Sequence, residues 1–128
     1  MQCRGTLIYA LPIFISALLT TSPQIAHAES GIASVYSGER TANGEYARAG
    51  AYTAAHKTLP FGTFVEVTNR NTGRSVIVRI NDRGPYRAGR IIDLTPAGSK
   101  AIGGDGLTPV TLTVLPRIGA HVGPTNHG

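Results

Sequence analysis

The chain has 128 residues, of which 41% are hydrophobic, and it carries a net charge of +5. This length supplies material for about one domain and excludes a multidomain protein, while the hydrophobic content excludes a wholly disordered chain. The 16 glycines and 8 prolines exceed the usual share and predict a fold rich in turns.

The first 28 residues have the features of a secretory signal peptide. Arg4 supplies a positive charge, residues 7–19 form an apolar run, and Ala-His-Ala at 26–28 matches a small-x-small cleavage site. A run of this length falls short of the roughly 20 apolar residues that a spanning helix needs. We expect cleavage near Ala28 and a mature product, residues 29–128, that is periplasmic or secreted and has no stable membrane anchor.

Thiol and metal chemistry find little support in the mature segment. The single cysteine, Cys3, lies within the predicted signal peptide, so no disulfide, thiolate nucleophile or lipid-modified cysteine is expected. No carboxylate stands at ligand spacing from His56, and the sequence predicts neither a metal site nor a cofactor. Without disulfides the core must stabilise the domain, and closing a sheet into a barrel would remove exposed strand edges.

Alternation of apolar and polar residues predicts short strands at 31–37, 90–94 and 107–115 and a hairpin at 64–80. In the hairpin, apolar residues at 65 and 67 and at 76, 78 and 80 flank a polar turn at 69–74. Thr95-Pro96 predicts the start of one short helix over 96–102. Five or six strands with one small helix indicate a compact β-barrel at 29–116. Residues 117–128 lack periodicity and are expected to form a flexible tail.

Carboxylates are the remaining candidates for catalysis, and the mature segment has seven: Glu29, Glu39, Glu45, Glu66, Asp82, Asp93 and Asp105. Asp82 directly follows an apolar strand and precedes a sharp turn at Gly84-Pro85. A carboxyl group in that position has a rigid base and can project its head into a groove. The alternative is a turn-forming aspartate bonded to its own backbone.

Two further acidic residues differ in their surroundings. Asp93 lies in the apolar run Ile-Ile-Asp-Leu at 91–94, where a partly buried carboxylate needs a partner. We expect a structural pairing of Asp93 with a nearby arginine. Glu45 lies in a flexible polar loop and would not be singled out by its surroundings alone.

Six motifs occur in one order along the chain: GIASVY at 31–36, TANGE at 41–45, TAAHKTLPFGT at 53–63, VEVTN at 65–69, VIVRINDRGPY at 76–86 and RIIDL at 90–94. In order and spacing they resemble the rare lipoprotein A family, over about residues 31–115. The resemblance implies an all-β fold, a six-stranded double-psi β-barrel with one short helix. It also implies a lytic transglycosylase that acts on the glycan strands of peptidoglycan.

The resemblance places the family's catalytic aspartate on Asp82 and its loop glutamate on Glu45. A further aspartate, three residues after that glutamate in well-studied members, is replaced here by Arg48. If Arg48 neighbours Glu45 in the folded loop, it favours the ionised form of that carboxyl group. We expect Asp82 to act as the acid and base and Glu45 to tune it or share its proton, which requires a pKa near the working pH.

The motifs also supply candidates for substrate binding: His56, Tyr36, Thr53, Arg83 and Tyr86. His56 is either a hydrogen-bond partner of the glycan or a histidine bonded within the barrel. The two tyrosines offer flat faces to sugar rings or pack against the barrel. Arg83 is expected to form a salt bridge more often than a contact with a substrate anion.

The activity implied by the resemblance is cleavage of the bond between N-acetylmuramic acid and N-acetylglucosamine, which leaves 1,6-anhydromuramic ends. Positive net charge is consistent with an anionic cell-wall polymer as partner, in preference to nucleic acid. One alternative is a noncatalytic, expansin-like module that binds or loosens wall glycan. Another is a hydrolase in which Glu45 and Asp82 form a carboxyl pair. The oligomeric state is left open.

Overall fold

A computed structural model describes residues 28–117 and 119–125. The predicted signal peptide therefore lies outside the described residues, apart from Ala28. Within the described part of the chain, no helix is long and apolar enough to cross a membrane.

Residues 28–117 and 119–125 form seven strands and one helix. In chain order they are β1 (Ala28–Val35), β2 (Thr53–Ala55), β3 (Phe64–Asn69), β4 (Ser75–Asp82), β5 (Arg90–Leu94), α1 (Pro96–Ala101), β6 (Thr108–Val114) and β7 (Gly123–Thr125).

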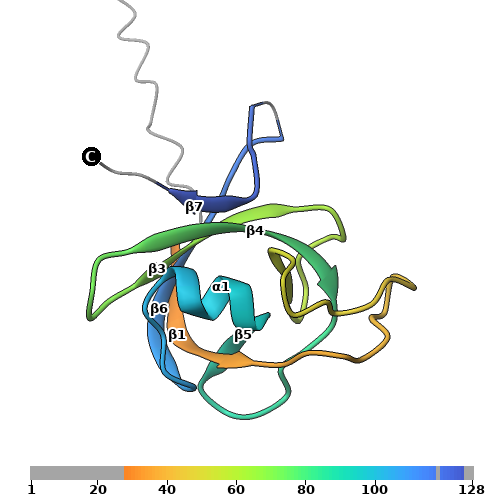
Figure 1. The fold of residues 1–128 in the computed structure, drawn as a ribbon, viewed down its shortest axis with the longest axis horizontal. Helices are drawn as coiled ribbons and strands as arrows, with labels where there is room; N and C mark the ends of the chain where they lie inside the picture. The colour runs from red at the N-terminus through yellow and green to blue at the C-terminus, as the bar shows by residue number, and fades with distance from the viewer. Residues whose placement is uncertain (1–27, 118, 126–128) are drawn as a thin grey trace, which may run out of the picture.

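Six of these strands close into a barrel. The order in the sheet is β2-β5-β1-β6-β3-β4, and a parallel pairing of β2 with β4 joins the two ends. In Figure 1 the strands form a ring, and α1 crosses its opening. β1 pairs in parallel with β5 and antiparallel with β6. The predicted six-stranded barrel with one short helix is therefore confirmed, and closure leaves few strand edges exposed.

The inward-facing residues of these strands form one hydrophobic core. Val65 and Val67 on β3 alternate with half-buried residues, which is the period-2 pattern of a strand with one face in the core. The largest buried apolar side chains are Ile80, Ile92, Leu94, Ile102, Leu112, Val65, Val67, Val76, Val78 and Val110. Burial of this set stabilises the domain in the absence of disulfides.

Helix α1 begins as the sequence predicts. The Thr95 hydroxyl is the N-cap and accepts a hydrogen bond from Gly98 N, while Pro96 occupies the first helical turn, where its missing N–H costs nothing. Ile102, directly after the helix, is completely buried in the core. The helix therefore covers one opening of the barrel (Figure 1).

Two strands differ from the sequence prediction. β2 has only three residues, all buried, so it has no alternating pattern to detect. β7 lies in the segment that was expected to be a flexible tail, and it pairs antiparallel with residues 75–77 of β4. This pairing depends on the β4 edge and not on any periodicity in the tail itself.

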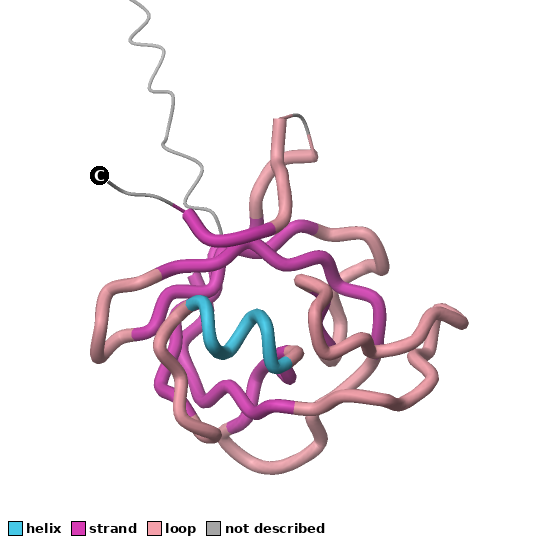
Figure 2. The backbone as a smooth tube through the Cα atoms, viewed as in Figure 1, coloured by secondary structure: helices cyan, strands magenta, loops and turns pink. Residues whose placement is uncertain are grey.

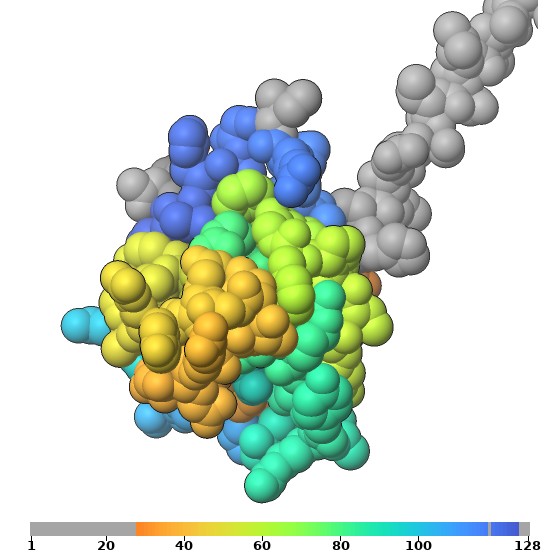
Figure 3. Space-filling model, turned by 90° about the vertical axis from the view of Figure 1, so that its right-hand side faces the viewer, coloured from red at the N-terminus to blue at the C-terminus, as the bar shows by residue number. Residues whose placement is uncertain are grey.

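The connections from β1 to β2 and from β2 to β3 lie at the same side of the barrel. Figure 2 shows the loops that join β1 to β2, and β2 to β3, on the same side of the ring as the end of β4. In Figure 3 the orange segment, which contains residues 38–47, lies in the foreground beside the yellow and lime segments and the blue-green segment after β4. Asp82, the last residue of β4, lies at this side.

Candidate active site

Asp82 is partly buried at the end of β4, and two segments hold its carboxyl group. Its Oδ1 accepts hydrogen bonds of 2.8 Å from Ala42 N and from Arg83 N. The second bond is local, as the turn-forming alternative requires, but the first comes from a residue 40 positions away. Asp82 therefore joins β4 to a distant loop, and its other oxygen, Oδ2, accepts neither of these bonds.

That loop is a short hairpin at residues 38–47. Gly38 N donates to Ala47 O at 2.7 Å, Ala47 N donates to Glu39 O at 2.8 Å, and Arg40 forms an isolated bridge with Tyr46. Gly44 has a φ of +93° at the tip, a conformation that glycine adopts without strain. The 38–47 hairpin thus has its own backbone hydrogen bonds, although most of its residues are exposed.

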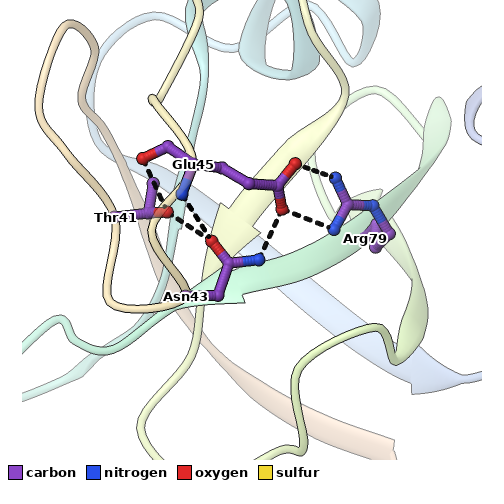
Figure 4. Close-up of polar contacts among 4 residues, drawn as sticks. All are labelled: Thr41, Asn43, Glu45 and Arg79. Atoms are coloured by element: carbon purple, nitrogen blue, oxygen red, sulfur yellow. Dashed lines mark hydrogen bonds and ion pairs between the residues drawn. The ribbon is translucent and has the colours of Figure 1, made fainter.

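Glu45 is fixed by an arginine on β4. Its carboxylate accepts two hydrogen bonds from the Arg79 guanidinium, at 2.8 and 2.9 Å, and a third from the side chain of Asn43 (Figure 4). These bonds, with that of Arg79 the largest cause, lower the pKa of Glu45 to about 2. Glu45 is therefore an ionised, compensated carboxylate at neutral pH and not a proton donor.

The arginine that pairs with Glu45 is Arg79 and not Arg48. Arg48 is exposed just beyond the hairpin, whereas Arg79 reaches Glu45 from an outward-facing position of β4. The expected direction of the effect on Glu45 is thus present, but a different residue causes it. The alternating pattern of the strand predicts that Arg79 faces outward. It does not predict that Arg79 binds Glu45, because the two residues are 34 positions apart in the sequence.

His56 is the buried residue of a turn at residues 56–59, of which Lys57 and Thr58 are exposed, and the turn contacts the backbone of Asp82. The imidazole Nδ1 accepts hydrogen bonds from Thr58 N and Leu59 N, both at 3.1 Å, and Nε2 lies 3.0 Å from Glu29 Oε2. The His56 side chain is only 6% exposed. Both ring nitrogens are therefore engaged within the protein, which favours the alternative of a histidine bonded within the barrel.

Arg83 links the same turn to β4. Its Nη1 donates to the carbonyl oxygens of His56, at 3.1 Å, and Leu59, at 2.7 Å. The guanidinium also lies over the ring of Phe61, 4.1 Å from the centroid. Arg83 thus binds backbone carbonyls and an aromatic face, where the sequence analysis expected a salt bridge.

Three buried polar groups surround this region without ordinary hydrogen bonds among the described residues: the Tyr36 hydroxyl, the Thr53 hydroxyl and the Asn81 side-chain amide. Burial raises the pKa of Tyr36, and the charges of Asp82 and Asp93 raise it further, so Tyr36 remains a neutral hydroxyl. The Asn81 amide contributes to the lowered pKa of Glu45 although no bond of ordinary geometry joins them. Asn81 has no local sequence feature that marks it as a site residue.

Asp93 has a structural partner, but it is a hydroxyl group and not an arginine. Ser34 Oγ donates a hydrogen bond to Asp93 Oδ1, and the two residues are direct partners in the β1–β5 pairing. The expectation of an arginine partner was wrong because strand register places a serine opposite Asp93. Gly84 lies next to the other oxygen: a Cβ at this position would be 3.7 Å from Asp93 Oδ2.

Tyr86 is 79% exposed, so it is free to offer a ring face to a ligand. A separate, mostly apolar cavity of about 480 Å³ lies beside Phe61 and is lined by Leu59, Phe64, Leu115 and Arg117 among others. Neither Glu45 nor Asp82 lines this cavity. Among residues 28–117 and 119–125, no group of three or more His, Cys, Asp or Glu side chains is arranged to hold a metal ion.

The closed six-stranded barrel and the aspartate at the end of β4 define a class of protein, the double-psi β-barrels of the lytic transglycosylase type. A model of a double-psi β-barrel family described as "Lytic transglycolase" matches residues 28–112. The chain belongs to this family, and its resemblance to rare lipoprotein A proteins is confirmed.

Relatives with assigned names carry the comparison further. The chain is 57% identical over 83 residues to a "Probable endolytic peptidoglycan transglycosylase RlpA" of Synechocystis sp., a match that covers 62% of this chain and 26% of the relative. It is 47% identical over 108 residues to the "Endolytic peptidoglycan transglycosylase RlpA" of Pasteurella multocida, covering 78% and 37%. The chain thus spans between about a quarter and two fifths of the length of these relatives.

Among solved structures, the apo form of the Clavibacter michiganensis expansin is similar, with a TM-score of 0.55 and 23% identity over 73% of this chain and 52% of that chain. A point mutant of the same expansin in complex with cellohexaose has a TM-score of 0.56 and 21% identity, with coverages of 73% and 53%. At this identity the likeness concerns the fold alone.

Proposed function

We propose that this protein is an endolytic peptidoglycan lytic transglycosylase and that Asp82 is its catalytic acid and base. One observation carries the assignment of the site: Asp82 lies at the rim of the barrel with Oδ1 fixed by two backbone N–H groups from separate segments. A fixed carboxyl group on a rigid strand end provides the orientation that proton transfer needs. The names of the relatives support the reaction.

In the proposed reaction, the C6 hydroxyl of N-acetylmuramic acid attacks its own C1. The C1–O bond to N-acetylglucosamine breaks, the leaving oxygen gains a proton and the C6 oxygen loses one. No water is consumed, and the product carries a 1,6-anhydro ring. A single carboxyl group that first gives a proton and then takes one is sufficient, whereas hydrolytic glycosidases use two. Oδ2 of Asp82 is the oxygen we assign to this transfer.

Glu45 has a different role in this proposal. Because Arg79 compensates its charge and holds its pKa at about 2, Glu45 does not share a proton with Asp82 at neutral pH. Instead, the Glu45–Arg79 pair anchors the 38–47 hairpin, whose Ala42 N–H contacts the Asp82 carboxyl group. This geometry disfavours a hydrolase in which Glu45 and Asp82 act as a pair.

Substrate contacts and location complete the proposal. Tyr86 is exposed and suited to a sugar face. Tyr36 lies close enough to Asp82 for its charge to raise the pKa of the hydroxyl, and Thr53 lies two residues before Ala55, which pairs with Asp82. Arg83 binds backbone carbonyls, so we assign it to the support of the site. The partner is the peptidoglycan glycan strand, which places the protein outside the cytoplasm. A signal peptide that ends near Ala28 would direct it there, to the periplasm or the medium.

A second candidate is a noncatalytic glycan-binding module of expansin type. The observation that favours it is the compensation of Glu45, which leaves Asp82 as the single uncompensated carboxyl group of the proposed pair. The shared fold with an expansin is compatible with both candidates.

Digestion of purified sacculi separates the candidates. The mature protein is expected to release fragments with anhydromuramic ends, identified by mass spectrometry, and the Asp82→Asn variant is expected to release none. Binding without release by both proteins would indicate the glycan-binding module. Reducing ends in place of anhydro ends would indicate a hydrolase.

A further inference from the structure

The 56–59 turn depends on one tautomer of a buried histidine. Nδ1 of His56 accepts hydrogen bonds from Thr58 N and Leu59 N, both at 3.1 Å. A nitrogen that accepts hydrogen bonds in the ring plane carries no proton, so the proton of the neutral ring is on Nε2. In the other tautomer, an Nδ1–H group would point at two N–H donors. The turn in this form therefore requires the Nε2–H tautomer.

Glu29 supplies the acceptor that the Nε2–H group of this tautomer needs. Its Oε2 lies 3.0 Å from His56 Nε2 and accepts the proton that the turn requires there. The acceptor on one ring nitrogen determines which tautomer a neutral histidine adopts. Glu29 lies on β1, 27 residues before His56, and its side chain is 48% exposed whereas that of His56 is 6% exposed. The Glu29 carboxylate is therefore partly exposed to solvent, whereas the His56 ring that it contacts is buried.

The turn in its correct form holds the backbone around Asp82. His56 N donates to Asp82 O at 3.1 Å, and the carbonyl oxygens of His56 and Leu59 accept Arg83 Nη1 at 3.1 and 2.7 Å. Arg83 N in turn donates to Asp82 Oδ1 at 2.8 Å. A continuous chain of hydrogen bonds thus runs from Glu29, through the imidazole and the 56–59 turn, to the carboxyl group of Asp82.

We infer that Glu29 is a positioning residue: by accepting the Nε2–H of His56 it fixes the tautomer that shapes the 56–59 turn and so orients Asp82. The inference deepens the proposed function and rests on it for the kinetic readout alone. It accounts for His56 as a residue that acts through Asp82. Glu29 also directly follows Ala28, so the first residue of the predicted mature chain would belong to the support of the active site.

Two substitutions at one position separate hydrogen bonding from charge. In Glu29→Gln the amide oxygen still accepts the Nε2–H bond, so the tautomer and the turn are expected to persist. In Glu29→Ala the acceptor is lost, and the Nδ1–H tautomer competes. Asp105→Asn serves as the control because it removes one exposed carboxylate from the turn before β6. Both positions are solvent-accessible, so the three variants are expected to fold.

The test that does not depend on activity is ¹⁵N NMR of the His56 ring, together with the amide resonances of Ala42, Thr58, Leu59 and Arg83. The parent, Glu29→Gln and Asp105→Asn are expected to show an unprotonated Nδ1 and matching amide shifts. Glu29→Ala is expected to show protonation of Nδ1 and displaced amide signals at all four residues. A parent ring protonated at Nδ1, or a Glu29→Ala spectrum that matches the parent, overturns the inference.

Kinetics on sacculi supply the second readout. Glu29→Ala is expected to lower kcat by about ten-fold with KM unchanged, the lower end of the loss seen when the hydrogen-bond partner that orients a metal-ligating histidine is removed. Glu29→Gln is expected to restore kcat. Equal kcat in Glu29→Ala and the parent overturns the positioning role. A parent with no lytic activity defeats the proposed function instead, and the NMR comparison then still decides the tautomer and the coupling to Asp82.

Discussion

The 38–47 hairpin and the 56–59 turn contact the same aspartate from two sides but are built in opposite ways. The hairpin is exposed, and among the described residues its side-chain ion pair with β4 is Glu45–Arg79, whose side chains are 45% and 31% exposed. Two backbone N–H groups of the hairpin also bond to Asn81 and Asp82. The turn is held by a buried imidazole and by backbone carbonyls that bind Arg83. Ion pairs near solvent are screened by salt, whereas hydrogen bonds to neutral backbone groups have no pair of opposite charges to screen. The contacts on the hairpin side of Asp82 should therefore respond to salt and pH more strongly than the contacts on the turn side.

Loss of the Asp82 carboxyl group, which lies between the hairpin and the turn, should have the largest effect on activity. Asp82→Asn preserves the shape of the side chain and an oxygen that can accept from Ala42 N and Arg83 N, but it removes the protonatable oxygen. We expect lytic activity to fall by at least about 10²- to 10⁴-fold, the usual contribution of a general acid or base. Release of anhydromuropeptides measures this. Sacculus binding equal to that of the parent shows that the glycan-binding surface is intact, and undiminished release would contradict the role of Asp82.

Damage to the turn that is held by the buried His56 should come next. His56→Ala leaves the N–H groups of Thr58 and Leu59 without their acceptor, at part-buried positions. Each such hydrogen bond contributes about 0.5–1.5 kcal/mol, so we expect the loss of two to lower the free energy of unfolding by roughly 1–3 kcal/mol. Urea denaturation measures the loss. Tyr86→Ala, at an exposed position, should change stability by less than about 0.5 kcal/mol. Equal losses in the two variants would show that the turn is not held by its histidine.

The stability that the exposed Glu45–Arg79 ion pair contributes should depend on pH. The pKa of Glu45 in the folded protein, about 2, lies below its ordinary value of 4.5. The ion pair therefore contributes stability above pH 4.5 that is lost as the pH falls toward 2. In Arg79→Met the pKa of Glu45 should rise toward 4.5, and this part of the pH dependence should disappear. Unfolding measured from about pH 2 to about pH 5 at low and high salt tests this, with Arg70→Met as a control on an exposed arginine.

The smallest effect is expected at Arg48, where the family's further aspartate is absent. Arg48→Asp introduces a carboxylate next to the hairpin without removing the Arg79 pair. We expect activity on sacculi to rise by less than about ten-fold, equivalent to under about 1.4 kcal/mol in the barrier, and stability to stay within about 0.5 kcal/mol of the parent. Arg48→Ala distinguishes loss of positive charge from gain of an acid. A drop in activity in Arg48→Asp would show that the arginine itself contributes.

Much of the barrel could be predicted because its signals are local. Alternation predicted the β3–β4 hairpin, Thr95-Pro96 predicted α1, and β5 was predicted at its observed bounds. β2 could not be predicted, since three small buried residues have no period, and β7 forms only because β4 offers an edge.

The candidate site was predictable to the same extent. Asp82 follows from its place between a strand and a turn and from the family motif. Its environment does not, because the partners that define it are distant in sequence: Arg79 is 34 residues from Glu45, and Glu29 is 27 residues from His56. The partner of Asp93 could not be predicted for the same reason, because Ser34 lies opposite Asp93 only through the register of β1 with β5. Side-chain pairing across the barrel is set by the tertiary fold.

The pairing of β1 also bears on how the protein reaches its folded state. The first strand has as neighbours β5 and β6, which lie near the other end of the domain. Contacts between such remote segments form late, because the entropy of closing the intervening chain must be overcome first. The ring therefore cannot close until β6 is available, whether the chain is delivered by a ribosome or by the translocation channel that the proposed export would use.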